Sequence, residues 1–234
     1  MFAAVNFALF IDSPARLDPG LAVSVTVTLT GKIAGEKKML LYSFFITPNN
    51  RKVEAFIKHY DLGVDIKQVN FREQENKSEA FLARNPMGKV PVLVDGELNL
   101  WESNAILTYL ARKFPATGVL PEDPAGRADV DRWLHWQSCH LMPAMGVLKT
   151  DSDADPAAVL NPLLQVLDKG LEGKEYLCGS LTVADFAVVA YLLTKMGRSL
   201  DLSDMPNVAA WRERMAGLKG FLETEYKGGF EAGK

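Results

Sequence analysis

The sequence contains little cysteine and little histidine, and these scarcities exclude several kinds of site. Of its 234 residues, two are cysteine and three are histidine. Cys139 and Cys178 lie far apart and form no CxxC pair, which argues against a disulfide framework, a zinc site and a dithiol redox centre. The histidines stand at positions 59, 135 and 140, so no metal cluster is expected. The composition therefore predicts a protein without a metal, in a reducing cytoplasm.

Long apolar runs and a basic excess are also missing. No run of about 18 apolar residues exists, so we expect no transmembrane helix. The formal net charge is −3 and the isoelectric point is about 5.7, so no basic surface favours nucleic acid or an anionic membrane as a partner. With 48% hydrophobic residues, the chain can fill an ordinary core in one large domain or two small ones.

The first 38 residues differ in composition from the rest. They begin with an apolar run, continue with a segment rich in proline, aspartate and glycine, and then alternate from Val23 to Leu29 as one strand would. The first eleven residues contain no Lys or Arg, which is unfavourable for a secretory signal. A strand-like run opens at Met39. We therefore interpret residues 1–38 as a peripheral N-terminal extension and hypothesise that translation naturally begins at Met39.

Residues 39–115 carry the pattern of a small mixed α/β domain. The apolar run from Met39 to Phe45 predicts a buried strand, and Thr47-Pro48 predicts a helix start, with threonine as N-cap and proline at the first helical position. The pattern then predicts a helix stopped at Gly63, a strand over 64–69, a polar helix over 78–84, a hairpin over 90–101 and a helix ending near Phe114.

The composition changes after this first domain. Residues 116–126 are rich in proline and glycine, and we expect them to form an interdomain linker. Beyond them no convincing strand pattern occurs, and apolar residues recur at helical spacing around 130–141, 160–171, 186–193 and 208–218. We therefore predict an all-helical domain over 127–234 that ends in a mobile, glycine-rich tail.

Three motifs, at residues 85–93, 101–107 and 180–186, lie within this framework. Together with the element order, they make residues 39–220 resemble the cytosolic glutathione transferase superfamily. The resemblance implies a thioredoxin-like N-terminal domain followed by an all-helical glutathione transferase C-terminal domain. It also implies a homodimeric enzyme that activates glutathione as a thiolate for attack on an electrophile. Glutathione would be the co-substrate, with no other cofactor.

In the first motif, the resemblance implies a cis bond between Val90 and Pro91. The bond would turn the Val90 backbone N–H and C=O outward to pair with the cysteinyl backbone of glutathione, as an added strand would. The structural alternative is a trans proline at the start of an edge strand. Lys89, directly before Val90, is a candidate for binding the glycine carboxylate of glutathione, and its alternative is an ordinary solvated lysine.

In the second motif, Glu102 and Ser103 suit the γ-glutamyl group of glutathione. A helix N-terminus with a serine hydroxyl would bind its carboxylate, and the Glu102 side chain would bind its ammonium. The structural alternative is that Ser103 caps the helix and Glu102 is a solvated charge. The third motif predicts a capping box between Thr182 and Asp185, which serves folding and carries no chemistry.

The turn after the first strand should hold the group that stabilises the thiolate. It contains no cysteine, which disfavours the cysteine-based classes of the superfamily. Thr47 stands where theta-like and delta-like classes carry serine, and Thr-Pro-Asn resembles the nu-class bacterial enzymes. The resemblance therefore implies Thr47 as the thiolate donor, assisted by Asn49. Thr47 as a simple N-cap is the alternative, and Ser43 and Tyr42, on the strand, are weaker competitors.

Two further questions stay open from the sequence. The nu-like resemblance also allows a glutathione-dependent disulfide or peroxide reductase, and the fold alone allows a non-catalytic interaction module. Arg132, Trp136 and His140 share a helical face by i, i+4 spacing and are candidates for the electrophile pocket, with core or interface packing as the alternative.

Overall fold

The computed structural model describes residues 38–44 and 46–225. Apart from Lys38, the predicted N-terminal extension lies outside these residues, as does the glycine-rich end of the predicted tail. Four short strands lie in the first part of the chain, and the second part is helical. The elements are β1 (Leu40–Ser43), α1 (Pro48–Tyr60), β2 (Asp65–Gln68), η1 (Glu75–Lys77), α2 (Glu79–Leu82), β3 (Val92–Asp95), β4 (Leu98–Trp101), α3 (Ser103–Lys113), η2 (Pro115–Thr117), α4 (Pro124–Trp136), the π-helical turn η3 (Gln137–Leu141), α5 (Met142–Thr150), α6 (Pro156–Gly170), α7 (Val183–Leu192), α8 (Lys195–Arg198), α9 (Pro206–Ala216) and α10 (Lys219–Glu223).

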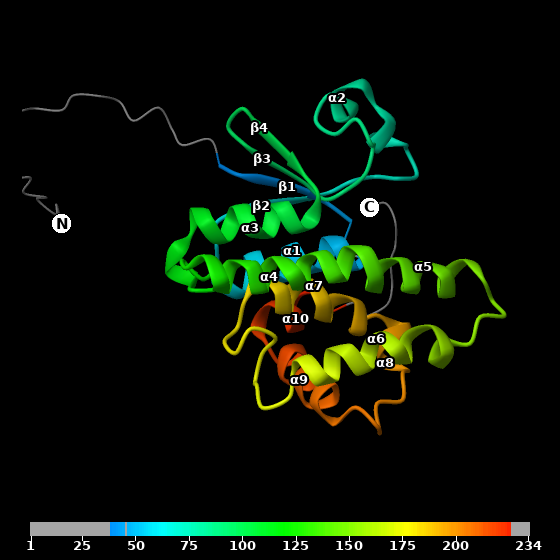
Figure 1. Ribbon diagram of the computed structural model, residues 1–234. Helices are drawn as coiled ribbons and strands as arrows, with labels where there is room; N and C mark the ends of the chain where they lie inside the picture. The colour runs from blue at the N-terminus through cyan, green and yellow to red at the C-terminus, as the bar shows by residue number, and fades with distance from the viewer. Residues whose placement is uncertain (1–37, 45, 226–234) are drawn as a thin grey trace, which may run out of the picture. The chain divides into compact units, whose positions relative to one another are not determined.

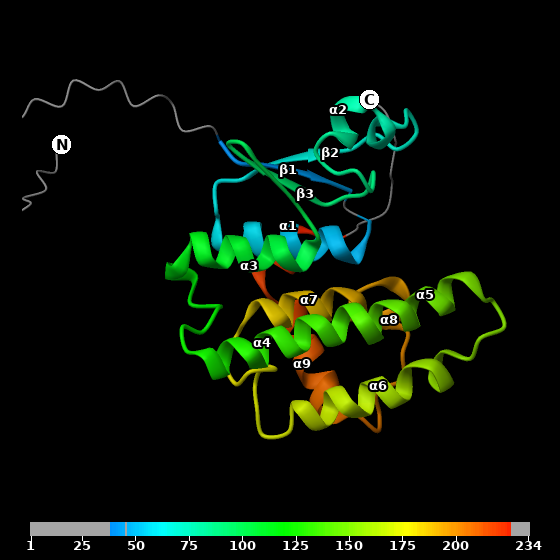
Figure 2. The same cartoon turned by 45° about the horizontal axis from the view of Figure 1, so that its top comes forward.

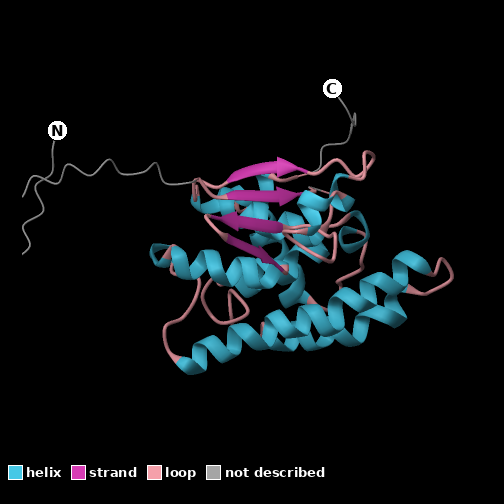
Figure 3. Cartoon of the chain, turned by 90° about the horizontal axis from the view of Figure 1, so that it is seen from above, coloured by secondary structure: helices cyan, strands magenta, loops and turns pink. Residues whose placement is uncertain are grey.

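The four strands form one mixed sheet in the order β2-β1-β3-β4 (Figure 3). The pair β1 and β2 is parallel because α1 carries the chain back between them, whereas β3 is antiparallel to both β1 and β4. Tyr42 lies opposite Val92, which in turn lies opposite Trp101. These three residues mark one end of the sheet. The arrangement confirms the predicted thioredoxin-like N-terminal domain.

The two faces of the sheet are covered by different helices (Figures 1 and 2). Leu41 and Leu93 belong to the large core that includes α1 and α3, whereas Val92 packs with Phe81 of α2 and with Tyr42 in a separate small cluster. Neighbouring residues of a strand point to opposite faces, which explains the division between Leu93 and Val92. The helical domain packs against α1 and α3 on their far side from the sheet.

Helix α1 begins as its sequence predicts. Thr47 is the N-cap in an extended conformation, and Pro48 occupies the first helical position. The buried apolar face contains Val53 and Phe56. The helix ends at Tyr60 with Asp61 as a left-handed cap at φ 51°, so the predicted stop at Gly63 is wrong by two residues. Aspartate tolerates this conformation better than most side chains do.

Helix α7 is the central helix of the second domain, since all of its residues are buried. Its start confirms the predicted capping box, in which the Thr182 backbone N–H donates to Asp185 Oδ2 at 2.9 Å. Asp185 Oδ1 also accepts from the Leu177 backbone N–H and from Trp211 Nε1, each at 2.9 Å. One buried carboxylate thus joins α7, α9 and the loop before α7. In the part of the chain that the structure describes, no helix is long and apolar enough to cross a bilayer.

The passage into the helical domain differs from the prediction. Helix α4 begins at Pro124, capped by Asp123, within the segment 116–126 that we expect to be the linker. The helix predicted through Leu141 widens into η3, where the Met142 N–H bonds to the carbonyl of Gln137, five residues back. Pro143 has no N–H for an ordinary helical bond, which accounts for the widened turn before α5. Sequence reasoning also missed α5, α8 and α10.

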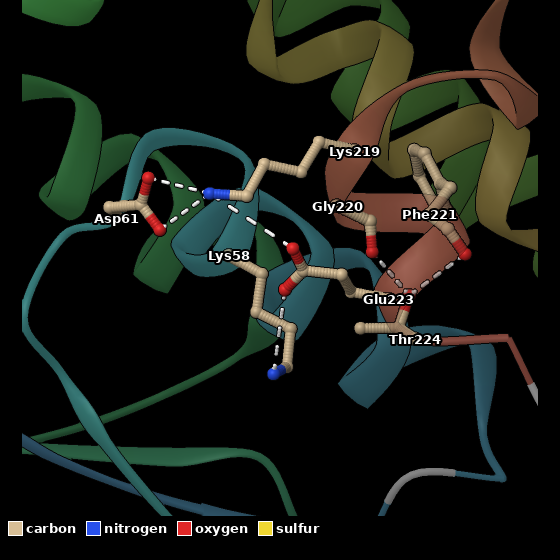
Figure 4. A network of polar contacts seen from close by, with 7 residues as sticks. All are labelled: Lys58, Asp61, Lys219, Gly220, Phe221, Glu223 and Thr224. Atoms are coloured by element: carbon tan, nitrogen blue, oxygen red, sulfur yellow. Dashed lines mark hydrogen bonds and ion pairs between the residues drawn. The ribbon is translucent and has the colours of Figure 1, made fainter.

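The last described helix, α10, lies against α1 (Figure 4). The Lys219 ammonium is 2.6 Å from a carboxylate oxygen of Asp61, and Glu223 lies 3.9 Å from Lys58. At Gly220 an added Cβ would meet the Ala55 carbonyl oxygen at 1.9 Å. The two backbones are therefore too close for any side chain at position 220, and the ion pairs flank this contact.

Candidate functional site

The sheet topology brings the six site residues that the sequence predicts to one end of the sheet. Because Tyr42, Val92 and Trp101 are neighbours across three strands, the turn after β1, the segment before β3 and the residues after β4 share that end. Thr47 and Asn49 belong to the first of these segments, Lys89 and Val90 to the second, and Glu102 and Ser103 to the third. All six candidate residues therefore come from this end of the sheet.

Thr47 is half-buried at the N-terminus of α1. Its Oγ1 accepts a hydrogen bond from the backbone N–H of Asn50 at 3.4 Å and a second one from the Asn50 side-chain amide. Thr47 is thus the N-cap of α1, which is the structural alternative to a thiolate donor that the sequence also allows. The cap uses the oxygen of the hydroxyl as an acceptor, and it leaves the hydroxyl proton to be donated elsewhere.

The segment before β3 is held by two buried asparagines that sequence reasoning did not single out. Asn76 Nδ2 donates to the Gly88 carbonyl at 2.8 Å, and Asn85 Nδ2 donates to the Lys89 carbonyl at 2.7 Å. The Val90–Pro91 bond is cis, which confirms the prediction. Since β3 begins only at Val92, Val90 lies outside the strand pairing, with Lys89 exposed beside it.

The positions of Glu102 and Ser103 after β4 correct the structural alternative that Ser103 caps α3. Glu102, rather than Ser103, stands at the N-cap of α3, and no side chain caps this helix. Glu102 is exposed and holds φ 71° and ψ 111°, and a positive φ is uncommon for a residue other than glycine. Ser103 is the first helical residue and is buried. The alternative that Ser103 merely caps α3 is therefore wrong.

Asn49 joins three elements of the site. Its Oδ1 accepts from Ser103 Oγ at 3.2 Å and from Tyr191 Oη of α7 at 2.8 Å, and its Nδ2 lies 3.8 Å from the Met142 sulfur of α5. Burial raises the pKa of Tyr191, so the phenol stays protonated and donates. Asn49 thus fixes Ser103 relative to the helical domain, and Tyr191 is a residue that sequence reasoning missed.

A buried lysine lies behind this group. Lys52 of α1 is 0% exposed, and its Nζ lies 2.6 Å from Asn104 Oδ1 and 3.0 Å from Gln137 Oε1. Burial lowers the pKa of Lys52 to about 7, and the nearby Glu102 charge opposes that shift. No sequence signal marks this lysine, because its acceptors come from α3 and from the π-helical turn.

The chemistry available here is hydrogen bonding and the field of two helix N-termini. Helices α1 and α3 both begin at this end, and their free N–H groups favour a carboxylate or a thiolate.

Burial raises the pKa of Cys178 to about 12, which makes that thiol unreactive. Within residues 38–44 and 46–225, no group of three or more His, Cys, Asp or Glu side chains is placed to hold a metal ion.

Two of the three residues proposed for the electrophile pocket, Arg132 and Trp136, pack around Trp133. Arg132 is exposed, pairs with Asp129 and stacks over Trp133. Trp136 packs edge-to-face on the same Trp133, with ring centroids 5.4 Å apart. Arg132 and Trp136 line a hollow of about 260 Å³ between α4 and α6, and His140 is exposed in the π-helical turn.

Comparisons with known proteins agree over both domains. Models of the glutathione S-transferase N-terminal and C-terminal domains match residues 37–112 and 149–219. Glutathione S-transferase D7 of Drosophila melanogaster is 33% identical over 181 residues, which cover 73% of this chain and 81% of that protein. Human glutathione S-transferase theta-1 is 33% identical over 199 residues, covering 77% and 83%.

Solved structures give the same result. The crystal structure of a glutathione transferase from Burkholderia graminis, with two glutathione molecules bound per subunit, matches with a TM-score of 0.72 at 28% identity. The match covers 82% of this chain and 89% of that one. With both domain models matched and relatives above 30% identity along most of its length, the chain belongs to the cytosolic glutathione S-transferase superfamily.

Proposed function

We propose that this glutathione S-transferase activates its co-substrate with the Thr47 hydroxyl and directs the thiolate at a small electrophile. The observation that carries the proposal is the state of that hydroxyl. Its oxygen accepts from Asn50, and its proton remains to be donated at the N-terminus of α1. A donor at this position, backed by the helix dipole, favours a thiolate over a thiol.

The remaining candidates would bind the two ends of glutathione. The N–H groups at the start of α3 suit the γ-glutamyl carboxylate, and the Ser103 hydroxyl, which donates to Asn49 Oδ1 in this structure, would turn to that carboxylate. The exposed Glu102 suits the ammonium of the same group. Val90, outside the strand pairing and before a cis proline, would pair with the cysteinyl backbone. Lys89 is exposed beside it and would pair with the glycine carboxylate.

In the reaction, the Thr47 O–H donates a hydrogen bond to the glutathione sulfur, assisted by Asn49 and nearby N–H groups. A free thiol with a pKa of about 8.5 is only a few per cent ionised at neutral pH. Each unit by which the site lowers that pKa requires about 1.36 kcal/mol of preference for the anion. The sulfur then forms a bond to the electrophilic carbon, and the leaving group departs with the bonding electron pair.

We further propose that the enzyme is a cytoplasmic homodimer, in which the first domain of one subunit pairs with the helical domain of the other. The relatives at about 33% identity belong to the same cytosolic superfamily. Light scattering at micromolar protein concentration tests the dimer, and a monomeric mass would contradict it.

The Thr47-Pro48-Asn49 string motivates a second activity at the same site, the nu-like reduction of disulfides or peroxides by glutathione. The two activities differ in their electrophile, which is carbon in one and sulfur or oxygen in the other. Assays with an aryl halide and with hydroxyethyl disulfide compare them directly. Turnover of the disulfide alone would replace the transferase proposal with the reductase.

Substitutions at Thr47 test the thiolate role. Thr47→Ser keeps the hydroxyl and should keep much of the activity, whereas Thr47→Val should raise the pKa of bound glutathione. Loss of the cap alone costs about 0.5–2 kcal/mol of stability and does not change that pKa. Ultraviolet titration of the bound thiolate and thermal unfolding, on the same samples, separate the two. A depressed thiol pKa that persists in Thr47→Val would contradict the role of Thr47.

A further inference from the structure

Two polar side chains lie buried directly behind Thr47. Ser43, the last residue of β1, is 0% exposed, and Asn50, the third residue of α1, is 1% exposed. Burying a hydroxyl and an amide beside an apolar core is unfavourable unless both are hydrogen-bonded. The hydrogen-bond partners of Ser43 and Asn50 therefore indicate what these two side chains do at the site.

The bonds run in one direction. Ser43 Oγ donates to Asn50 Oδ1 at 3.1 Å, and Asn50 Nδ2 donates to Thr47 Oγ1. The backbone N–H of Asn50 approaches the same Thr47 oxygen at 3.4 Å. Both acceptor positions of the Thr47 hydroxyl are thus taken by one residue, and its proton has to point away from α1.

We propose that Asn50 is a positioning residue for catalysis, which orients and polarises the Thr47 hydroxyl so that its proton is presented to the sulfur of glutathione. The inference rests on the proposed role of Thr47. Donors aligned in one sense strengthen each other, because each accepted bond makes the next hydroxyl a better donor. Ser43 is the first donor of this chain, Asn50 the link and Thr47 the last donor.

Helix capping by itself does not require this arrangement. An N-cap threonine needs one backbone N–H to bond to, and the Asn50 main chain supplies it, shared between Thr47 Oγ1 at 3.4 Å and the Thr47 carbonyl oxygen at 3.1 Å. The side-chain amide adds a second donor to the same oxygen and occupies a buried position of α1, where asparagine is an unfavourable helix residue. The Ser43 hydroxyl, in turn, satisfies the Asn50 carbonyl oxygen and fixes which way the amide faces.

Asn50→Asp is the strongest perturbation, because it keeps the shape and replaces the amide donor with an acceptor, and Asn50→Ala is its uncharged counterpart. The carboxylate would draw the Thr47 proton onto itself and away from sulfur. We expect the pKa of bound glutathione to rise by about one unit and kcat to fall by up to about tenfold at a pH below that pKa, where the thiolate fraction changes about tenfold per pKa unit. The KM for glutathione should change much less. Asn50→Ala and Ser43→Ala should shift the pKa in the same direction by successively smaller amounts.

Two readouts, the thiol pKa and the thermal stability, identify the cause. The charged and titratable side chains around this turn, namely Arg51, Lys52, Glu102 and Tyr191, are unaltered in Asn50→Ala and Ser43→Ala, so the thiol pKa in these two variants reports on the hydroxyl chain. Asn50→Asp also adds a carboxylate, which raises the thiol pKa by direct repulsion, so its shift counts only together with that of Asn50→Ala. Thermal unfolding monitors stability, and a loss of stability with an unchanged thiol pKa would overturn the inference. Ser43→Ala, the mildest change, provides the same test if Asn50→Asp fails to fold.

Combination with Thr47→Val separates this inference from the proposed function. If Asn50 acts through Thr47, Asn50→Ala should shift the thiol pKa no further once Thr47 is valine. If Thr47→Val raises the pKa and neither Asn50→Asp nor Ser43→Ala does, Thr47 keeps its role and the inference for Asn50 is overturned. If Thr47→Val leaves the pKa unchanged, both are overturned.

Discussion

Lys52 Nζ lies 2.6 Å from Asn104 Oδ1, in a contact that joins the first helix of the sheet domain to the residue after Ser103. Gln137 of the π-helical turn accepts a second bond from the same nitrogen. The lysine therefore links α1, α3 and the helical domain at a point that water does not reach. Its pKa of about 7, against an ordinary 10.5, follows chiefly from that burial.

This burial predicts a dependence of stability on pH. Between pH 7 and about 10, the unfolded chain keeps the Lys52 proton, whereas the folded chain has lost it. Raising the pH disfavours the protonated unfolded chain, so the free energy of unfolding should rise by up to about 1.4 kcal/mol per pH unit from this group. Below pH 7 both states are protonated, and the contribution is constant.

Lys52→Met isolates the effect, because other titrating groups are common to both proteins. Urea unfolding from about pH 6 to pH 9 should show the wild type gaining stability over the variant as the pH rises. If the free energies of unfolding of the two proteins changed in parallel with pH, Lys52 would not lose its proton on folding and the prediction would be wrong.

Glu102→Ala and Ser103→Ala should each weaken glutathione binding by about 1–3 kcal/mol, the cost of leaving a charged group of the ligand unpaired. This corresponds to a rise in Kd of roughly 5- to 150-fold. Calorimetric titration with glutathione measures it, with Glu122→Ala, an exposed glutamate outside the site, as the control. Unchanged affinity in both site variants would refute the assignment of the γ-glutamyl subsite.

Gly220→Ala should destabilise the protein by about 2–3 kcal/mol, because the new Cβ would lie 1.9 Å from the Ala55 carbonyl oxygen and backbone must move to relieve the overlap. Gly146→Ala in α5 is the matched control. Nothing lies within 4 Å of its added Cβ, so alanine should be neutral or stabilise by up to about 1 kcal/mol. Equal melting temperatures for the two variants would argue against close packing of α10 on α1.

Asp185→Ala should cost at least about 3 kcal/mol, since it leaves the buried N–H groups of Leu177, Thr182 and Trp211 without their acceptor. Asp204→Ala, at an exposed aspartate, should have little effect. Chemical denaturation of both variants gives the comparison, and a change below about 1 kcal/mol for Asp185→Ala would contradict the role of this carboxylate.

Sequence reasoning succeeded where neighbouring residues determine the structure. The Thr47-Pro48 helix start and the Thr182–Asp185 capping box each involve residues only a few positions apart, so both could be predicted from the sequence. The same holds for the turn at Asp95 and Gly96, which joins β3 and β4. The cis bond before Pro91 was predicted from the resemblance rather than from these local rules.

Sequence reasoning did not succeed where the structure depends on residues that are far apart in the sequence. Lysine is seldom fully buried, so no local rule predicts the burial of Lys52 against Gln137. The bond between Tyr191 and Asn49 joins residues separated by 142 positions. The π-helical turn before Pro143 was not predicted either, because neighbouring residues do not show how a helix accommodates a proline.

The docking of α10 on α1 also bears on how the protein is made. Synthesis proceeds from the N-terminus, so α1 leaves the ribosome early, while α7 and α10, which cover it, are made last. Until about residue 223 has emerged, the apolar face of α1 with Phe56 lacks part of its covering. The apolar face of α1 is therefore fully covered only once the last described helix has been made.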